Sequence, residues 1–352
     1  MPDEPRIPIV DAHLDMAWNV LKGRDLRLEA AEVRAAEMAD EHECMVTLPE
    51  LRRGGVAIAF GSIFVRPQHT GRDVDPVFDP DTAAEGRRQA EVYRRWEDQG
   101  LVRIIRDRRS LDSHLTAWTE DSIPGIVVAI EGAEPIRDAD EPEWFELGVR
   151  SIGTAWGFSR FSGGYSGSWG RPGGFTPLGR ELLAGMNEVG ILLDLAHSSV
   201  ETWHEGVELA AGRVACTHTS PREVLGVERM PDAAMRAELA QAGGVVGLGL
   251  GGVFLHRGWW ADQAGGRPPL GLNRVGEVFT ELAQGAGWEH VGIGSDLDGG
   301  IGVQESPDEL ESIADIGRIA EVLPAESSAD VMGENWISLL RRVLPATVPA
   351  PV

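Results

Sequence analysis

Short apolar segments alternate with amphipathic segments along almost the whole chain, and this alternation most constrains the fold. Several of the short segments are apolar at nearly every position, as expected of strands buried on both faces. Strands of this kind, each followed by a helix, are typical of repeated βα units and a parallel sheet. The segments expected to form strands are Ile7–His13, Val56–Val65, Ile126–Ile130, Val149–Ala155, Ile191–Ala196, Val214–Thr217, Val245–Leu250 and Val291–Gly294.

Eight strands are the number that closes a (β/α)8 TIM-type barrel, so we expect an α/β fold of this class. A chain of 352 residues fits one such domain, and we interpret residues 1–352 as a single unit whose tail frays from about residue 345. Thr176-Pro177 and Ser220-Pro221 have the pattern of helix starts. Helices are expected over Asp81–Gln99, Thr176–Val189, Ser199–Ala210, Asp232–Gln241, Leu272–Ala286 and Pro307–Val322, with an additional C-terminal helix over Ser328–Val343.

The charge of the chain excludes some classes of partner. A formal net charge of −24 argues against nucleic acid and anionic membrane surfaces, which are bound through Lys and Arg. The same acidity serves solubility or adaptation to high salt, and composition leaves both open. The two cysteines, Cys44 and Cys216, have no metal-site or disulfide spacing, and no segment is apolar for the ~18 residues of a membrane span. We therefore expect a cytoplasmic protein.

Six side chains of the metal-binding type lie where the expected strands end. Parallel barrels build their sites at the carboxyl ends of the strands, so these side chains are expected to meet in one polar site. Imidazole and carboxylate are common ligands of divalent zinc. The six residues are His13, Asp15, Glu131, His197, His218 and Asp296.

The spacing gives most of these residues a role. His13 and Asp15 are two apart on a strand and share a face, although a short His-x-Asp motif also occurs in exposed turns. Glu131 ends an apolar strand, where a buried carboxylate needs either a metal or an arginine as its partner. His197 and His218 end consecutive strands, which places their rings close together.

The remaining residues of these segments have other roles. Asp296 could accept a proton from a metal-bound water and deliver it to a leaving amine, whereas Asp298 fits a turn before Gly299 and Gly300. The only lysine, Lys22, lies beyond the first strand, so it is not placed to bridge two metals as a carbamate. The loops Gly157–Phe175 and Gly251–Pro269 follow the fourth and seventh strands, where substrate pockets form.

These motifs together resemble the membrane (renal) dipeptidase family of the amidohydrolase superfamily, in its soluble bacterial form. The resemblance runs from about Ile9 to Leu344. It depends on DAHLDMAW, the glutamate of VAIEGA, GFTPLGRELLAGMNEVGILLDLAHSS, the histidine of THTS, HVGIGSDLDGG and the terminal MGENWISLLRRVL.

The resemblance implies a two-zinc centre and a reaction. One zinc would be held by His13, Asp15 and Glu131, and the other by Glu131, His197 and His218, so that Glu131 bridges the pair. The implied activity is hydrolysis of dipeptides by a metal-bridging hydroxide, with a D-residue accepted at the C-terminal position, and Asp296 matches the proton-shuttling aspartate. Relatives are often homodimers, although no stretch of this sequence identifies an interface.

The resemblance also implies a substrate site, with departures. Arg229 lies eleven residues after His218, where the family has an arginine for the substrate's carboxylate. Trp156 stands where mammalian members have a histidine, and Phe254 where a tyrosine is expected. The aromatic residues Trp18, Trp156, Phe158 and Trp169 predict a more apolar pocket than that of the mammalian enzyme.

Three functions are therefore weighed. The first is a zinc dipeptidase acting on a small-molecule substrate. The second is hydrolysis of a different bond by the same metal centre, in an N-acyl amino acid, a cyclic amide or a lactone. The third is a barrel that binds a ligand without turnover, which would have no need for Glu131 and Asp296 together.

Overall fold

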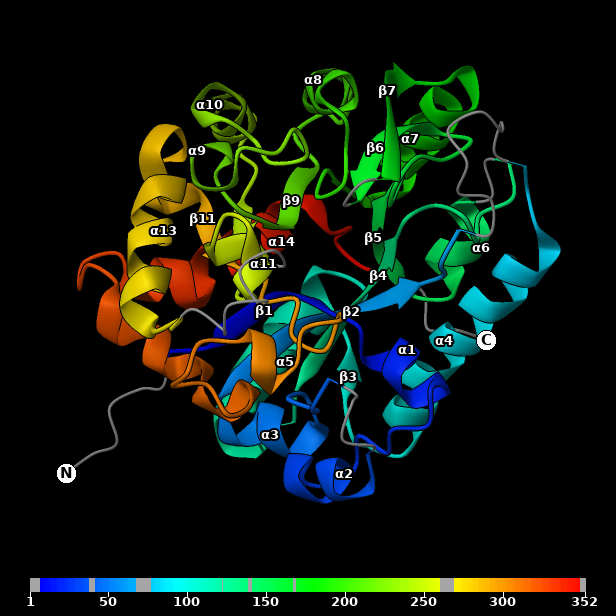
Figure 1. The fold of residues 1–352 in the computed structure, drawn as a ribbon. Helices are drawn as coiled ribbons and strands as arrows, with labels where there is room; N and C mark the ends of the chain where they lie inside the picture. Colours follow the sequence, from blue (N-terminus) through cyan, green and yellow to red (C-terminus); the bar gives the residue numbers. More distant parts are fainter. Residues whose placement is uncertain are drawn as a thin grey trace.

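The apolar segments form parallel strands that close into a barrel (Figure 1). The computed structural model describes residues 7–37, 42–67, 77–121, 123–138, 141–166, 169–259 and 269–348. Neighbouring strands follow the order β2-β1-β11-β10-β9-β8-β5-β4, and β4 pairs again with β2, which completes the ring. The eight strands are β1 Ile9–Leu14, β2 Val56–Phe64, β4 Gly125–Glu131, β5 Val149–Gly153, β8 Leu192–Asp194, β9 Val214–Thr219, β10 Val246–Leu248 and β11 Val291–Ile293.

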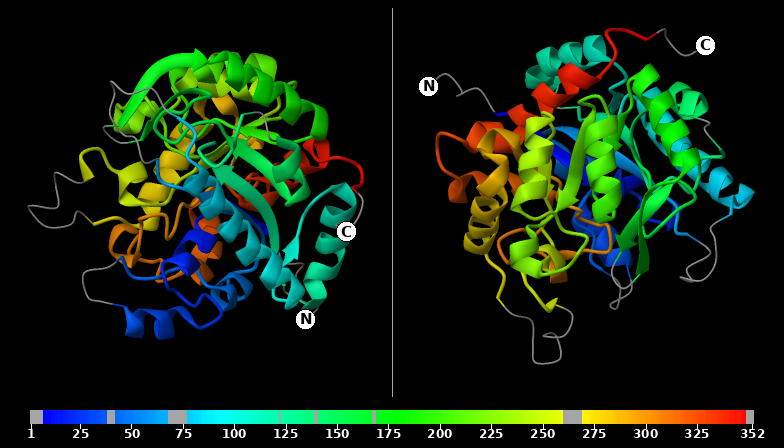
Figure 2. Two further views of the ribbon diagram at one scale, coloured as in Figure 1. Left: turned by 90° about the vertical axis from the view of Figure 1, so that its right-hand side faces the viewer. Right: turned by 90° about the horizontal axis from the view of Figure 1, so that it is seen from above.

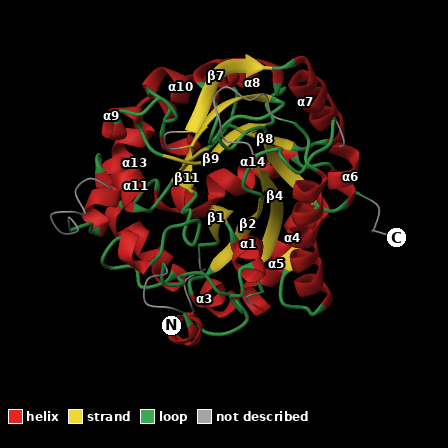
Figure 3. Cartoon of the chain, turned by 45° about the vertical axis from the view of Figure 1, so that its right-hand side comes forward, coloured by secondary structure: helices red, strands yellow, loops and turns green. Residues whose placement is uncertain are grey.

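All eight expected strands are therefore present, and the (β/α)8 fold class is confirmed. One further strand, β3 (Arg103–Ile104), adds a short parallel pairing to β4. Helices surround the ring in every view (Figures 2 and 3). The helices before β8 are α1 Met16–Leu21, α2 Ala30–Ala36, α3 Leu48–Arg53, α4 Pro80–Asp98, α5 Arg108–Asp121, α6 Glu141–Glu146 and α7 Pro177–Val189.

The second half of the chain departs in places from the expected helices. Thr176 caps α7 by accepting from the Gly179 N–H, as its pattern predicted. Ser220 was wrongly assigned a capping role, because its hydroxyl donates to the Phe254 carbonyl and α9 begins after Pro221. The later helices are α8 Val200–Leu209, α9 Arg222–Leu225, α10 Ala233–Gln241, α11 Gly252–Leu255, α13 Leu272–Ala286, η2 Trp288–His290 and η3 Val303–Glu305.

The α-helix expected over Pro307–Val322 is also wrong. The chain forms a 3₁₀-helix instead, η4 over Ile313–Val322, and Ser312 caps it. Its buried isoleucines Ile313, Ile316 and Ile319 recur every three residues, and a helix with three residues per turn aligns such a repeat directly along one face. The spacing of the core residues therefore fits the 3₁₀ form that the chain adopts.

The C-terminal helix lies across the barrel rather than beside its last unit. It consists of a π-helical turn, η5 (Asp330–Glu334), followed by α14 (Asn335–Val343), and in the view of Figure 3 α14 overlaps the centre of the ring of strands. Asn335 donates to the carbonyl of Val291, the first residue of β11, while Trp336 packs on Phe60 with ring centroids 5.6 Å apart. α14 therefore lies near the amino-terminal ends of the strands, and their carboxyl ends are left for a site.

The loop after β5 contains regular secondary structure of its own. It forms an antiparallel hairpin of β6 (Ser162–Ser166) and β7 (Trp169–Phe175) that packs on α8. At the tail, the Arg108 N–H donates to the Pro345 carbonyl, and the Val348 N–H donates to Asp107, so these residues are held against the barrel. Residues 349–352 lie outside the described residues. Among the described helices, none has the length and apolar character needed to cross a membrane.

Candidate metal centre

The six side chains assigned from the strand ends converge on one site. His13 and His218 lie in the last two residues of β1 and β9, and Glu131 is the last residue of β4. Asp15 follows β1 directly, whereas His197 and Asp296 each lie three residues beyond β8 and β11. The adjacent pairing of β8 with β9 brings the two later histidines together, with Nε2 atoms 3.0 Å apart.

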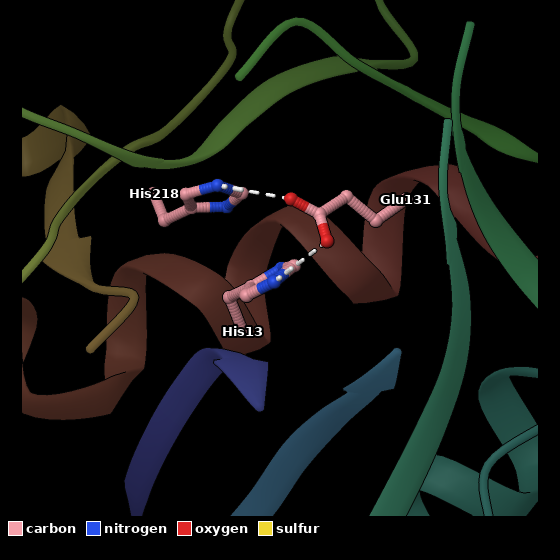
Figure 4. A group of neighbouring side chains, drawn as sticks. All are labelled: His13, Glu131 and His218. Carbon is pink, nitrogen blue, oxygen red and sulfur yellow. Dashed lines mark ion pairs between the residues drawn. The ribbon is translucent and has the colours of Figure 1, made fainter. Parts of the chain in front are cut away.

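Glu131 lies at the centre of this group and uses its two oxygens differently. Oε2 is 3.6 Å from His13 Nε2, whereas Oε1 is 2.9 Å from His197 Nε2 and 3.5 Å from His218 Nε2. Figure 4 shows His13 and His218 approaching different oxygens of this one carboxylate. A carboxylate in this position can serve two ligand sets at once, which is the geometry that a bridging ligand requires.

His13 Nε2 is a buried nitrogen without a hydrogen-bond partner. It lies 3.9 Å from one oxygen of Asp15, 3.9 Å from one of Asp296 and 3.6 Å from Glu131. These separations are too long for hydrogen bonds, but they are close to the ~3.3 Å that separates two ligands on a tetrahedral zinc with bonds of ~2.0 Å. The nitrogen and three carboxylates therefore fit a divalent cation between them.

Among the described residues, two overlapping groups have ligand atoms that all lie within 4.8 Å of one another. They are His13 with Glu131 and His218, and His13 with Asp15 and Asp296. The resemblance divides the ligands differently, with Asp15 beside Glu131 and with His197 beside His218. The way in which the ligands are shared between two ions therefore remains a proposal.

The electrostatics of the site also favour a cation. Burial would by itself lower the pKa of His13, but the three surrounding carboxylates raise it to about 10. Burial and the nearby Glu131 raise the pKa of Asp15 to about 6, and burial raises the pKa of Asp296 well above its usual range. Carboxylates packed this closely repel one another, so a divalent ion would stabilise their charged forms.

Hydrogen bonds orient both later histidines with Nε2 toward the site. His197 Nδ1 lies 2.9 Å from the Tyr165 carbonyl oxygen, which can only accept, so Nδ1 carries the proton. Thr217 Oγ1 donates to Asp194 at 2.5 Å and is 3.1 Å from His218 Nδ1, so it accepts from that ring. In both rings Nε2 is therefore the unprotonated nitrogen, whose lone pair can bind a metal.

Thr217 is consequently expected to set metal affinity without touching the metal. Thr217→Val keeps the shape of the side chain but removes the acceptor for His218 Nδ1. We expect metal affinity to fall about 10–100-fold, as is typical when a residue that hydrogen-bonds to a metal ligand is replaced. Competition with a chromophoric chelator measures the affinity, and ¹⁵N NMR of histidine-labelled, metal-free protein reports the tautomer. Thr217→Ser is the matched control and should retain both; an unaltered affinity in the valine variant would contradict the assigned relay.

A hydrogen bond and the local backbone hold the carboxylates of Asp15 and Asp296 in place. Asp15 accepts a hydrogen bond from Ser62 Oγ. Asp296 has a φ of +60°, in the left-handed region that aspartate tolerates better than most residues. A Cβ on Gly299 would lie 2.0 Å from Asp296 Oδ1, so only glycine leaves room for this carboxylate. Asp298 lies in a turn, as expected, and it is also buried and accepts from the N–H groups of Met45 and Val46.

A cleft of about 260 Å³ opens beside the metal centre, and four of the six side chains line it: Asp15, Glu131, His197 and Asp296. Arg229, Trp156 and Phe254 all line it, as the resemblance implied. Arg229 is partly buried, its Nη2 donates to His197 Nε2 at 2.9 Å, and its guanidinium lies 5.5 Å from the Phe254 ring.

The two loops expected to form a pocket both contribute to this cleft. Ser166 comes from the loop after β5, and Val253 and Phe254 come from the loop after β10. Phe158, expected in the pocket, lines a different hollow beside Arg160, and the side chain of Trp169 lies outside the described residues. Residues 260–268 of the second loop likewise lie outside the described residues.

Sequence reasoning missed several residues that support the site. Thr217 precedes His218 directly and Asp194 ends β8. The sequence shows where both residues lie, but it does not show that they are hydrogen-bonded to each other. Phe64 ends β2 and lines the cleft, which its place at a strand end could have indicated. The Tyr165 carbonyl gives no sequence signal, because any residue offers the same group.

Known proteins share both the sequence pattern and the fold. The model of the membrane dipeptidase family, peptidase family M19, matches residues 4–347. An uncharacterized Klebsiella pneumoniae protein from the pqqA 5′ region is 29% identical over 237 residues, which are 64% of this chain and 84% of that protein.

Two solved structures have the same fold over nearly their whole length. Dipeptidase AC, a metallopeptidase of family M19, aligns with a TM-score of 0.77 and 24% identity over 96% of this chain and 99% of that chain. A Rhodobacter sphaeroides metallopeptidase, solved with a phosphinate mimic of the dipeptide L-Ala-D-Ala, aligns with a TM-score of 0.75 and 24% identity, again over 96% and 99%.

Proposed function

The chain belongs to the membrane dipeptidase family of metallopeptidases, and we propose that it hydrolyses dipeptides with two zinc ions bridged by Glu131. The observation that carries the proposal is the position of Glu131, whose two oxygens face His13 on one side and two further histidines on the other. We propose His13, Asp15, Glu131, His197 and His218 as the zinc ligands.

Each group near the centre has a chemical task. Zinc, when bound, lowers the pKa of water and polarises a carbonyl group as a Lewis acid. We assign to Asp296 the proton transfer, because its Oδ1 lies 3.9 Å from His13 Nε2 at the edge of the ligand group and its carboxylate lines the cleft. It would accept a proton from the attacking water and return it to the leaving amine.

Arg229 is the proposed partner of the substrate's carboxylate. Its guanidinium lines the cleft next to the ligand group, and guanidinium binds carboxylate in a bidentate way. Arg229 and a zinc ion would compete for the same lone pair on His197 Nε2, so we expect the guanidinium to turn toward the cleft when zinc binds. Binding of the metal would thereby present the arginine to the substrate.

The stereochemistry of the substrate is part of the proposal. The Rhodobacter sphaeroides metallopeptidase with the same fold binds a mimic of L-Ala-D-Ala. We propose that this chain also accepts a D-residue at the C-terminal position, since recognition through a carboxylate and a metal-bound carbonyl leaves the C-terminal side chain unspecified.

A second substrate class is favoured by one observation. Trp156 packs beside His197, with ring centroids 6.0 Å apart, at the position where mammalian members have a histidine. An indole cannot exchange a proton as imidazole does. Hydrolysis of an N-acyl amino acid, a cyclic amide or a lactone by the same centre is therefore the alternative.

Removal and return of metal test the proposal. We expect purified protein to contain about two zinc ions per chain, to cleave members of a panel of L-L and L-D dipeptides, to lose this activity with chelator and to regain it with zinc. An N-acyl amino acid or cyclic amide cleaved faster than every dipeptide would favour the alternative. Absence of both zinc and chelator-sensitive cleavage would indicate a barrel that only binds a ligand.

A further inference from the structure

One side of the cleft is formed by three aromatic rings in contact. Trp18, on α1, meets Phe64 with ring centroids 6.4 Å apart and an edge-on orientation, and Phe64 meets Trp156 at 5.3 Å. All three side chains are only partly buried, and all three line the cleft. We call Trp18, Phe64 and Trp156 the aromatic wall. Partly exposed aromatic rings that converge on a cleft are typical of a ligand-binding surface.

The aromatic wall and Arg229 lie on different arcs of the barrel. Trp18 and Trp156 follow β1 and β5, and Phe64 ends β2; in the ring, β2 and β5 are the neighbours of β4 with its Glu131, and β1 lies beyond β2. Arg229 and Phe254 follow β9 and β10, which lie across the ring from β4, beyond β8 and His197. A substrate whose scissile carbonyl lies at the ligand group and whose carboxylate meets Arg229 must therefore extend its acyl part toward the aromatic wall.

The charges near the wall narrow the class of acyl group further. Among the described residues that line the cleft, the charged ones are Arg229 and the three carboxylates of the metal centre, Asp15, Glu131 and Asp296. These three carboxylates belong to the metal centre, where a bound cation would neutralise them, and the ammonium of Lys22 lies 5.2 Å from the Trp18 ring, where it would repel a basic side chain. An acidic side chain would have to give up its hydration against apolar rings.

We infer that the cleft selects substrates whose acyl residue carries an aromatic or large aliphatic side chain, which packs on the aromatic wall. This inference rests on the proposed function, because it takes the scissile bond to lie at the metal centre. Burying an aromatic side chain against aromatic rings adds apolar area and ring contacts that a glycine or alanine cannot make. Phe64 and Trp156 are then specificity-determining residues for the acyl side.

A dipeptide series with a constant leaving residue tests the inference. With zinc-loaded enzyme and D-Ala as the C-terminal residue, we expect kcat/KM for L-Phe and L-Leu at the acyl position to exceed that for Gly by at least about tenfold. L-Glu and L-Lys at that position should fall below L-Leu, although they are of similar length. Equal rates for Gly and L-Phe, or a preference for Gly, would overturn the inference while leaving the dipeptidase activity in place.

Variants then assign the preference to the wall. Phe64→Ala and Trp156→Ala should each reduce the ratio of kcat/KM for L-Phe over Gly by at least about fivefold, whereas Trp156→Phe should retain most of it. Trp288→Ala is the matched control, because Trp288 is also partly buried but lies on η2 outside the cleft, and it should leave the ratio unaltered. Thermal unfolding confirms that each variant is folded, and a ratio that stays constant in both wall variants would contradict the assignment.

A binding measurement separates this inference from the proposed function. Calorimetry with phosphinate mimics of L-Phe-D-Ala and Gly-D-Ala compares the two acyl groups without turnover. We expect the L-Phe mimic to bind at least about tenfold more tightly. A panel in which no dipeptide is cleaved would contradict the proposed function, and equal affinities of the two mimics would contradict the aromatic wall as a selective surface.

Discussion

Replacing Glu131 with glutamine is expected to lower kcat/KM by more than about 100-fold, a larger loss than is usual when a residue that only hydrogen-bonds to a metal ligand is replaced. The reason is the position of this side chain, whose Oε2 faces His13 at 3.6 Å while Oε1 faces His197 at 2.9 Å. An amide has one oxygen in place of two, and it carries no charge. The variant should therefore lose zinc together with activity, because neither ligand set is complete without the carboxylate.

Zinc content by elemental analysis and kcat/KM for a cleaved dipeptide are measured on the same preparation. Glu146→Gln is the matched control, since Glu146 is exposed on α6 and should leave both quantities unaltered. Full zinc content in the Glu131 variant would show that the bridge has been assigned to the wrong residue. Thermal unfolding of the metal-free forms separates loss of ligation from loss of fold.

Replacing Asp296 with asparagine should give the opposite pattern, with zinc retained and kcat reduced about 10²–10⁴-fold. Asparagine tolerates the left-handed backbone at this position as aspartate does, so the φ of +60° should persist. The amide is also close in size to the carboxylate that Gly299 accommodates. What the variant loses is a group that can take a proton and return it.

The effect of Asp296→Asn belongs to kcat more than to KM, because proton transfer occurs in the transition state and not in substrate binding. Asp308→Asn provides the control, as Asp308 is exposed and follows the same strand. Activity near that of the unaltered enzyme would mean that another base carries the proton. A loss of zinc in the variant would instead make Asp296 a ligand, consistent with its place near His13 and Asp15.

The helices show where sequence patterns stop being sufficient. A pattern of three-residue spacing among Ile313, Ile316 and Ile319 lies within a stretch that also contains good helix formers, and propensity alone favoured an α-helix. In the folded chain all three isoleucines are buried along one face of a 3₁₀-helix, a form that their spacing fits but does not by itself require. The C-terminal helix was located correctly in sequence, but its place across the amino-terminal end of the barrel depends on contacts such as that of Trp336 with Phe60, which are far apart along the chain.

The aromatic wall and the histidine relays show the same limit at the site. Trp18 and Phe64 are separated by more than forty residues, and their contact depends on how α1 follows β1 beside β2. The proton on His197 Nδ1 depends on a carbonyl from the β6–β7 hairpin, which the sequence presented only as a loop rich in Gly and Ser. Neither relation has a local pattern that could reveal it.

The sequence by itself determined the eight strands and, through them, the candidate ligands, because apolar segments buried on both faces are readable locally and parallel strands bring all their carboxyl ends to one side. Only the tertiary structure decided which oxygen of Glu131 faces which histidine, where Arg229 meets the cleft and which rings stand opposite it. Those relations depend on the order and register of strands around the ring, and closure of the barrel fixes that order through contacts between residues distant in sequence.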